Sequence, residues 1–339
     1  MVFQSCSPTV YLFAGHKMGI HGGGSTCAQL SRAYARAGYS VVYIAPDCKR
    51  TELVDGLSIK EIPNSGFDPK LWLADATEDD ILHVALPCKK AMDALRRFPG
   101  KALYHCRDNW DVWNDATGKK KPWSWYVPGL EKKFIRMVPV SYAVSPALRE
   151  YVGAAKVLPN AYDPNIFRWK DRCGPVRDVV LWGFSGGFID RELLSEVASR
   201  TPFIDYTLIG GKPIKEPERV GWNVVYLGGK LITELPSIAA EADLGIIIRQ
   251  GDTANYMCPI KAWEYLGAGL RFVSAGPDYP NRDYNPACIN SGSTDPNDIA
   301  RTIIEAYDII PELTKEDALP HTWDKRVETI LADLEVCYG

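Results

Sequence analysis

The sequence has 339 residues, of which 46% are apolar and 24% are charged, and these proportions exclude a disordered or fibrous chain. Lysine and arginine together number 39 and aspartate and glutamate 42, so the formal net charge of -3 gives no overall argument for a nucleic-acid or membrane partner. No apolar run approaches the roughly 18 residues that a membrane-spanning helix needs. The length predicts two domains.

The N-terminal segment and the cysteines both indicate a cytoplasmic protein. The first residues lack a basic region, and the apolar run VYLFA at 10–14 is too short for a signal peptide. Nine cysteines are present, and no two of them have the CxxC spacing of a zinc or redox site. We therefore expect free thiols in a reducing compartment.

The first half of the chain alternates apolar runs with a helix-like segment. The run at 10–14 predicts a strand, and the spacing at 28–37 predicts a helix capped by Ser25 or Thr26. The β-branched and aromatic run at 40–45 predicts the next strand. Further strands are expected at 81–85, 102–105, 142–144 and 156–158.

The alternation restarts in the second half after a polar, proline-bearing stretch that has no periodicity. Strands are expected at 179–182, 206–209, 223–227 and 244–248, with helices near 191–199 and 235–241. Strands that alternate with helices indicate parallel sheets. The pattern therefore predicts an α/β protein with two Rossmann-like domains, whose parallel sheets face a central cleft.

Three glycines at 22–24 and Ser25 lie between the first expected strand and the first expected helix. Glycine lets a backbone approach a ligand closely, and a helix N-terminus attracts phosphate. The dinucleotide fingerprint GxGxxG is not met because position 27 is Cys, although Asp47 stands where a ribose-binding acid would be. A phosphate- or sugar-contacting loop, an NAD site and a flexible turn all stay open.

A GxSxG pattern at 183–187 follows the strand expected at 179–182. In a hydrolase, the helix begins at the serine of this pattern, so that the hydroxyl is exposed on a sharp turn. Here Asp190 is the better N-cap, five residues after Ser185, and His321 is the available histidine. The pattern favours a glycine-rich turn at the cleft, with a serine hydrolase as an alternative.

The segment 252–269 combines a helix start with two charged residues at helical spacing. Pro259 suits the first turn of a helix, and Lys261 and Glu264 are three residues apart and share a face. A lysine opposes the dipole at a helix N-terminus, and a bound polyanion would offset that local cost. A surface ion pair is the alternative explanation.

Residues 89–136 hold twelve lysines or arginines against five acids, together with Trp110, Trp113, Trp123 and Trp125. Basic residues among aromatics suit nucleic-acid contacts, sugar stacking or an anionic surface, and a solvated helix face above core tryptophans is the plain alternative. No Asp-x-Asp sequence occurs, and no histidines have HxxxH spacing, so we expect no metal. His16 and His21 flank the glycine loop.

Residues 259–269, PIKAWEYLGAG, resemble the P-x-K-x-x-E-Y-L-A-x-G signature of retaining GT-B glycosyltransferases, in the large group that includes family 4. Other pieces resembling this family follow in the family's order. They are the glycine loop with AGYSVVYIAP, YAVSPAL at 142–148, KVLPN at 156–160, LGG at 227–229 and HTWD at 321–324.

The resemblance implies a GT-B architecture in four parts: an acceptor domain at 1–160, a linker at 161–178, a nucleotide-sugar donor domain at 179–318, and a helix at 319–339 that crosses back to the first domain. It also implies transfer of a sugar from a nucleotide-sugar donor, with a UDP-sugar expected, to a hydroxyl acceptor. Transfer would retain the anomeric configuration and need no metal or cofactor.

The same resemblance assigns the donor contacts. Glu264 would bind the ribose hydroxyls, and Lys261 would face the diphosphate beside the helix N-terminus. The family's second glutamate is Tyr256 here, and its usual Arg/Lys pair is absent from 184–190, so Arg249 or Lys230 is expected to supply a cation. The remaining expected donor contacts are Pro259, Ile260, Gly23, Gly24 and Gly183.

The acceptor is expected at the first domain. Asp108, His105 and His16 are the side-chain candidates for chemistry there, with Arg249 and Lys261 acting on the leaving group. Arg107, Trp110 and Trp113 are the expected acceptor contacts. The acceptor classes are a glycan, a small molecule or a hydroxymethylated base of DNA. A non-catalytic protein that binds nucleotide-sugar or nucleic acid is a further alternative.

Overall fold

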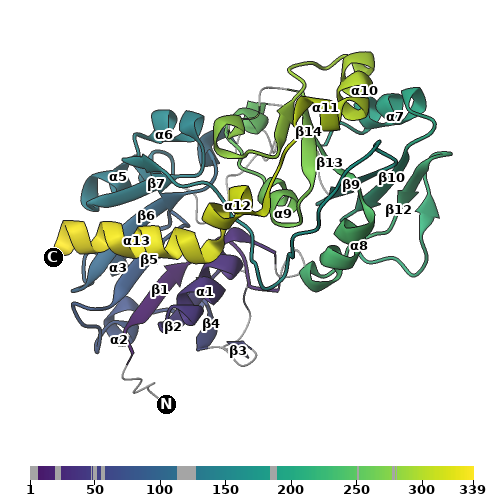
Figure 1. The fold of residues 1–339 in the computed structure, drawn as a ribbon. Helices are drawn as coiled ribbons and strands as arrows, with labels where there is room; N and C mark the ends of the chain where they lie inside the picture. The colour runs from purple at the N-terminus through teal and green to yellow at the C-terminus, as the bar shows by residue number, and fades with distance from the viewer. Residues whose placement is uncertain are drawn as a thin grey trace. The chain divides into compact units, whose positions relative to one another are not determined.

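The computed structural model describes residues 7–19, 24–46, 48, 52–54, 58–112, 127–183, 189–249, 252–276, 279 and 281–339. The chain divides into two compact units (Figure 1). The first unit comprises Met1–Leu158 together with Trp323–Gly339, and the second comprises Pro159–Thr322. Each unit is an α/β fold around its own sheet, which confirms the prediction of two Rossmann-like domains with parallel sheets.

The described part of the first unit forms an eight-stranded sheet in the order β3-β4-β2-β1-β5-β6-β7-β8. All pairs are parallel except β3 with β4, which is antiparallel. The apolar runs form central strands because helices on both faces of a parallel sheet remove them from water. The strands are β1 (Thr9–Phe13), β2 (Ser40–Ala45), β3 (Glu52–Val54), β4 (Ile59–Pro63), β5 (Ile81–Val84), β6 (Lys101–Cys106), β7 (Val140–Ala143) and β8 (Lys156–Val157).

Several helices of the first unit begin directly after a residue whose side chain caps the helix N-terminus. Ser25 accepts a bond from the amide of Ala28 and starts α1, so the predicted N-cap is confirmed. The other helical segments are η2 (Asn64–Gly66), α2 (Pro69–Trp72), α3 (Lys89–Leu95), α5 (Leu130–Met137), α6 (Pro146–Val152) and, at the C-terminus, α13 (Trp323–Tyr338).

The C-terminal helix α13 packs against α1, β6 and β7 of the first unit (Figure 1). Arg36 pairs with Asp324 at 2.8 Å, and the Tyr142 hydroxyl donates to Asp333 at 2.6 Å. The buried side chains of α13 recur at helical spacing toward the sheet: Trp323, Val327, Ile330 and Leu334. This helix therefore completes the core of a unit whose other elements end at residue 158.

The described part of the second unit forms a seven-stranded sheet in the order β11-β12-β10-β9-β13-β14-β15, in which only the pair β11 with β12 is antiparallel. The strands are β9 (Asp178–Trp182), β10 (Asp205–Ile209), β11 (Glu218–Arg219), β12 (Val224–Tyr226), β13 (Leu244–Ile248), β14 (Arg271–Ala275) and β15 (Cys288–Asn290).

Helices cover this second sheet as they cover the first. α7 and α10 pack against each other, and α9 packs against β13 and β14 (Figure 1). The helical segments are α7 (Arg191–Arg200), η3 (Ile232–Glu234), α8 (Leu235–Glu241), η4 (Asp252–Asn255), α9 (Ile260–Gly267), η5 (Arg282–Tyr284), α10 (Pro296–Ile304), α11 (Ala306–Ile309), α12 (Lys315–Ala318) and η6 (Leu319–His321).

The polar stretch 161–178, expected as a linker, lies within the second unit and packs on it. Tyr162 forms a parallel bridge with Thr322, and its ring lies so close to Gly267 that a Cβ there would be 2.3 Å from the ring. Phe167 stacks on Trp182 with ring centroids 6.0 Å apart. The sequence of this stretch lacks periodicity because individual aromatic side chains, Tyr162 and Phe167, pack it on the unit, and most of it forms no helix or strand.

Within the described residues, no helix combines the length and the apolar character that crossing a membrane requires.

Candidate functional site

The site in the second unit is built on the first turns of α9. Pro259 is its N-cap residue, and within the described part of the chain no side chain caps the first turn and no acid lies in it. The N-terminal amides and the positive end of the helix dipole are therefore not offset by the usual devices. Lys261 and Glu264 project from this helix, as predicted.

Glu264 is buried and held by a partner from a distant strand. Its side chain is 5% exposed, and its Oε2 accepts a 2.6 Å bond from Nε1 of Trp182, the last residue of β9. Burial raises the pKa of Glu264 to about 7, while the bond from Trp182 and the charge of Lys261 lower it. The carboxyl group thus has one fixed oxygen, and its charge depends on pH near neutrality.

Lys261 lies over the backbone at the end of the same strand. A Cβ on Gly183 would be 3.2 Å from both Cε and Nζ of Lys261, and Gly183 has φ +70°. The left-handed backbone conformation favours glycine here, and an added Cβ would also press against the end of the lysine side chain. Burial lowers the pKa of Lys261 to about 8, with Glu264 raising it and Arg249 lowering it.

Arg249, expected to face a diphosphate, is a buried cation at the end of β13. Its Nη1 donates to the carbonyl of Ala254 at 2.5 Å, and its guanidinium lies 5.3 Å from the ring centroid of Tyr279. These contacts hold the segment that leads into α9. The charge of Arg249 also lowers the pKa of Lys261. The predicted contact of Arg249 with a diphosphate stays a prediction.

Lys230 follows β12, and its Nζ lies 3.9 Å from a carboxylate oxygen of Glu234. The pair is largely exposed, so solvent screens it. The structure describes no contact between Lys230 and the residues of α9, and the predicted donor contact stays a prediction.

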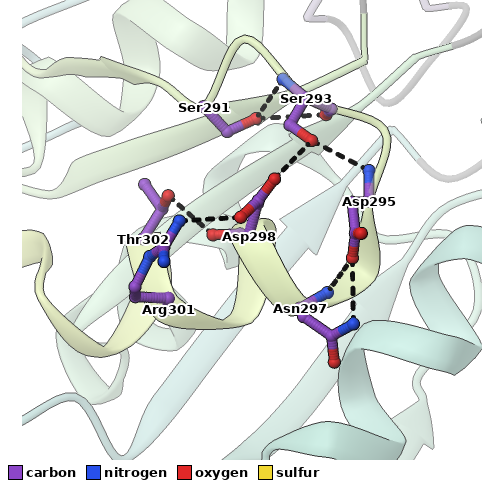
Figure 2. Close-up of polar contacts among 7 residues, drawn as sticks. All are labelled: Ser291, Ser293, Asp295, Asn297, Asp298, Arg301 and Thr302. Atoms are coloured by element: carbon purple, nitrogen blue, oxygen red, sulfur yellow. Dashed lines mark hydrogen bonds and ion pairs between the residues drawn. The ribbon is translucent and has the colours of Figure 1, made fainter.

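The N-terminus of α10, in the same unit, is capped by side chains (Figure 2). Asp295 accepts from the amide of Asn297 at 2.7 Å, and Ser293 bonds to Asp298 in the first turn at 3.1 Å. Side-chain oxygens and an acid thus satisfy the amides and the dipole of α10. Among the described residues, the first turn of α9 has no side-chain cap and no acid, and it carries Lys261. The N-terminus of α9 is therefore a better place for an anionic ligand than the N-terminus of α10.

Three residues that the sequence analysis missed position α9. The thiol of Cys258 accepts from Nε1 of Trp263 at 3.1 Å and from the amide of Asn160 at 3.4 Å. The Asn160 side-chain amide also donates to the carbonyl of Cys258. Local sequence held no signal for the contact between Asn160 and Cys258 or for that between Trp182 and Glu264, because these partners lie 98 and 82 residues apart.

The residues of the GxSxG alternative are only partly described. The helix that follows begins at Arg191, and Asp190 caps it by accepting from the amide of Leu193 at 2.9 Å, which confirms the predicted N-cap. Ser185 lies outside the described residues. His321 packs its ring 5.1 Å from Trp263 in the second unit. A helix that starts six positions after the serine differs from a nucleophile elbow.

In the first unit, His105 lies in the core. It is 1% exposed, and its Nε2 donates to the carbonyl of Leu158 at 3.3 Å. Burial and the charge of Arg107 lower its pKa to about 3. His83 lies beside it with ring centroids 5.7 Å apart. A neutral, buried imidazole of this kind favours a structural role over contact with an acceptor.

The other candidates of the first unit follow strand ends. Arg107 and Asp108 come directly after β6 and are partly buried, while Trp110 is buried. His16 is exposed, and its carbonyl accepts from the Tyr43 hydroxyl at 2.7 Å. Gly24 precedes the Ser25 cap. The remaining predicted residues of this unit, Gly23 and Trp113, lie outside the described residues.

No group of three or more histidine, cysteine, aspartate or glutamate side chains placed to hold a metal ion occurs within the ranges that the structure describes.

Comparisons with known proteins identify the fold. No protein-family model matches the sequence, and no curated protein matches it. Solved structures do match over nearly the whole chain. HepE from Anabaena in complex with UDP-glucose is 11% identical with a TM-score of 0.63, covering 97% of this chain and 99% of that one.

Two further solved structures have the same arrangement. Sucrose-phosphate synthase from Thermosynechococcus elongatus is 13% identical with a TM-score of 0.59, covering 97% of each chain. A UDP-forming α,α-trehalose-phosphate synthase from Burkholderia xenovorans is 10% identical with a TM-score of 0.60, covering 97% of this chain and 99% of that one. The fold is therefore GT-B, with two Rossmann-like units, as the sequence predicts.

Proposed function

We propose that this GT-B protein is a glycosyltransferase whose second unit binds a nucleotide-sugar donor, with UDP-glucose as the first donor to test. The observation that carries the proposal is the buried carboxyl group of Glu264, fixed by Trp182 one helical turn after the uncapped start of α9. The fold supports it, because structures of the same fold include HepE in complex with UDP-glucose and a UDP-forming synthase.

Each group of the site has a task in this proposal. The two ribose hydroxyls donate to the carboxylate of Glu264, which is a charge-assisted contact. The diphosphate lies at the N-terminal amides of α9 with Lys261 beside it. As the bond between the sugar and the diphosphate breaks, negative charge builds on the leaving group, and these fixed positive groups stabilise it by about 2–4 kcal/mol each.

The reaction is proposed to retain the anomeric configuration and to use no metal ion. The leaving diphosphate takes the proton of the acceptor hydroxyl, so no side-chain base is needed, and Asp108 is the side-chain alternative. Product anomers read by NMR test the retention. Unchanged turnover in the presence of a chelator tests the absence of a metal, and a loss restored by a divalent ion contradicts it.

The acceptor classes remain a glycan or small molecule and a hydroxymethylated base of DNA. Three of the four tryptophans that motivate DNA, Trp113, Trp123 and Trp125, lie outside the described residues. A duplex-binding measurement at low and high salt separates the classes, because phosphate contacts weaken steeply as salt rises. Absence of duplex binding at low salt excludes DNA.

The decisive test of the donor site is Glu264→Gln. Loss of a hydrogen bond to a charged group costs about 1.5–3 kcal/mol, so UDP affinity measured by calorimetry should fall roughly 10- to 100-fold. Glu192→Gln, an exposed position in the first turn of α7, is the matched control and should leave affinity unchanged. Wild-type affinity in a folded Glu264→Gln protein contradicts the proposal.

Two alternatives predict different outcomes. A serine hydrolase would be labelled by a fluorophosphonate probe, and Ser185→Ala would abolish the labelling. A non-catalytic binding protein would bind UDP-glucose but neither transfer nor hydrolyse it with any acceptor. Donor turnover together with absence of labelling supports the glycosyltransferase.

A further inference from the structure

A partly buried arginine in the first unit lies against the backbone of a distant strand end. Arg107 directly follows β6, and its Nη2 is 3.2 Å from the position that a Cβ on Gly15 would occupy. Gly15 follows β1, and β5 lies between the two strands in the sheet. The side chain therefore reaches along the carboxyl edge of the sheet, past the end of β5. Carboxyl edges are where open α/β sheets bind ligands.

The guanidinium has no salt bridge within the described residues. Its Nε is buried and, within that part of the chain, makes no hydrogen bond. Burial of an uncompensated charge is costly, so such groups usually occur with a counter-ion. Four groups act electrostatically on Arg107: Asp108, Cys27, Tyr43 and Tyr104. The thiol and the two phenols are neutral at pH 7, so Asp108 is the one negative charge among these four groups.

Two positive groups act in this region, the guanidinium of Arg107 and the start of a helix. Burial, and to a lesser extent the charge of Arg107, lowers the pKa of His83 and of His105, so both imidazoles stay neutral and add no charge. Helix α1, of 11 residues, starts nearby and has no acid in its first turn, and the charge of Arg107 acts on its second residue, Cys27. The positive end of the helix dipole and the guanidinium thus act on the same region.

We propose that Arg107, lying against Gly15, forms an anion site in the first unit that binds a phosphate group. A guanidinium presents a planar fork of N–H donors that matches two phosphate oxygens, and it stays charged at every physiological pH. Glycine at position 15 lets the guanidinium lie close to the backbone, because an added Cβ would be 3.2 Å from its Nη2. The phosphate belongs to a phosphorylated acceptor, because the proposed function already places the diphosphate of the donor at α9, and this assignment rests on the proposed function.

The test counts phosphate sites by calorimetry with inorganic phosphate as the probe. Wild-type protein is compared with Arg107→Gln, Lys261→Gln and the double variant, because α9 provides a separate anion site under the proposed function. Arg107→Gln should remove one site or weaken it at least tenfold while the site at Lys261 stays. Arg136→Gln, an exposed arginine in the last turn of α5, is the matched control and should change nothing.

Two results overturn the proposal: unchanged phosphate binding in Arg107→Gln, or only one phosphate site in the wild type that Lys261→Gln abolishes. If Arg107→Gln fails to fold, Arg107→Lys replaces it. This variant keeps the charge and loses the fork, and it should weaken the site severalfold. Wild-type phosphate affinity in Arg107→Lys also counts against a phosphate bound by the fork.

The source of the phosphate follows from a second titration of Arg107→Gln with UDP. A fall in UDP affinity parallel to the loss of the phosphate site contradicts a phosphorylated acceptor. Unchanged UDP affinity, together with loss of binding of a hexose 6-phosphate, assigns it to a phosphorylated acceptor. Glu264→Gln should weaken UDP in either case, so failure of the proposed donor site is seen separately from failure of this one.

Discussion

Two opposing effects act on the carboxyl group of Glu264. Burial favours its neutral form, and the bond from Trp182 favours the charged form. The result is a pKa of about 7, so ionisation occurs close to the working pH of a cell. A carboxylate accepts hydrogen bonds from ribose hydroxyls more strongly than a neutral carboxylic acid does. The affinity for donor should therefore depend on pH through this one residue.

The substitution Trp182→Phe tests this dependence. The substitution keeps an aromatic ring, although a smaller one, and removes the N–H donor, so the pKa of Glu264 should rise. UDP affinity measured by calorimetry across pH should fall as the pH drops below about 7 in the wild type. In Trp182→Phe the same fall should begin at higher pH. An unmoved pH profile would show that Trp182 does not act on the carboxyl group.

A second buried acid, Glu131, should make the stability of the first unit depend on pH. It lies in the first turn of α5 and accepts from the Tyr104 hydroxyl at 3.2 Å and from the Cys106 thiol at 3.0 Å. Burial raises its pKa from 4.5 to about 7. Between these values the unfolded chain has released the proton that the folded chain still holds, so stability falls as the pH rises through this window.

Glu131→Gln should remove that pH dependence. The difference in unfolding free energy between variant and wild type should grow from pH 4.5 to about pH 7, by roughly 3 kcal/mol, and stay constant above. Urea denaturation at several pH values measures it. A difference that does not change with pH would mean that the carboxyl group titrates normally in the folded protein.

At the scale of elements, the helix α9 is fixed from both ends. The Cys258 thiol and Asn160 hold its start, and near its end Gly267 admits the ring of Tyr162. Fixing both ends places Lys261 and Glu264 relative to β9, where Trp182 and Gly183 lie. The precision of the site is thus a property of how α9 packs and not of α9 alone.

Gly267→Ala tests this packing. In a solvent-exposed helix, alanine would stabilise relative to glycine by about 1 kcal/mol. Here the new Cβ would lie 2.3 Å from the ring of Tyr162, so overpacking should instead destabilise by about 1–3 kcal/mol. Gly19→Ala, with no described atom within 4 Å of the added Cβ, is the control in thermal unfolding. Stabilisation by Gly267→Ala would contradict the close approach.

At the scale of the whole chain, the C-terminus belongs to the unit in which the chain begins. Helix α13 supplies core side chains to the first unit, and Lys156 pairs with its Asp333 at 2.5 Å. The first unit is therefore built from two segments far apart in sequence. Its core includes side chains from α13, whereas the second unit is one continuous segment.

Ile330→Ala should destabilise the first unit by roughly 2–5 kcal/mol, because this side chain is fully buried. Hydrogen exchange should increase through residues 7–158 and much less in the second unit. Val336→Ala on the same helix is the control, because Val336 is 85% exposed. Equal effects of the two substitutions would contradict the packing of α13.

Local patterns in the sequence were sufficient for the architecture and for placing two candidate residues on one helix. Alternating apolar runs and helix-like segments predicted two parallel sheets covered by helices. A strand that is buried on both faces is apolar along nearly its whole length, and such runs can be read from the sequence. The spacing in PIKAWEYLGAG placed Lys261 and Glu264 on one helix face, since residues three apart in a helix are neighbours. Caps such as Ser25 and Asp190 were also evident, because a cap acts within a few residues.

Long-range packing decided the rest. Trp182 is 82 residues from the carboxyl group that it binds, and no local pattern connects the two. His105 stands at a strand end in the sequence, yet the helices around β6 bury it, and burial makes its imidazole neutral. The charge state of a side chain depends on solvent exclusion and on neighbours from other elements, and both exist only once the chain has folded.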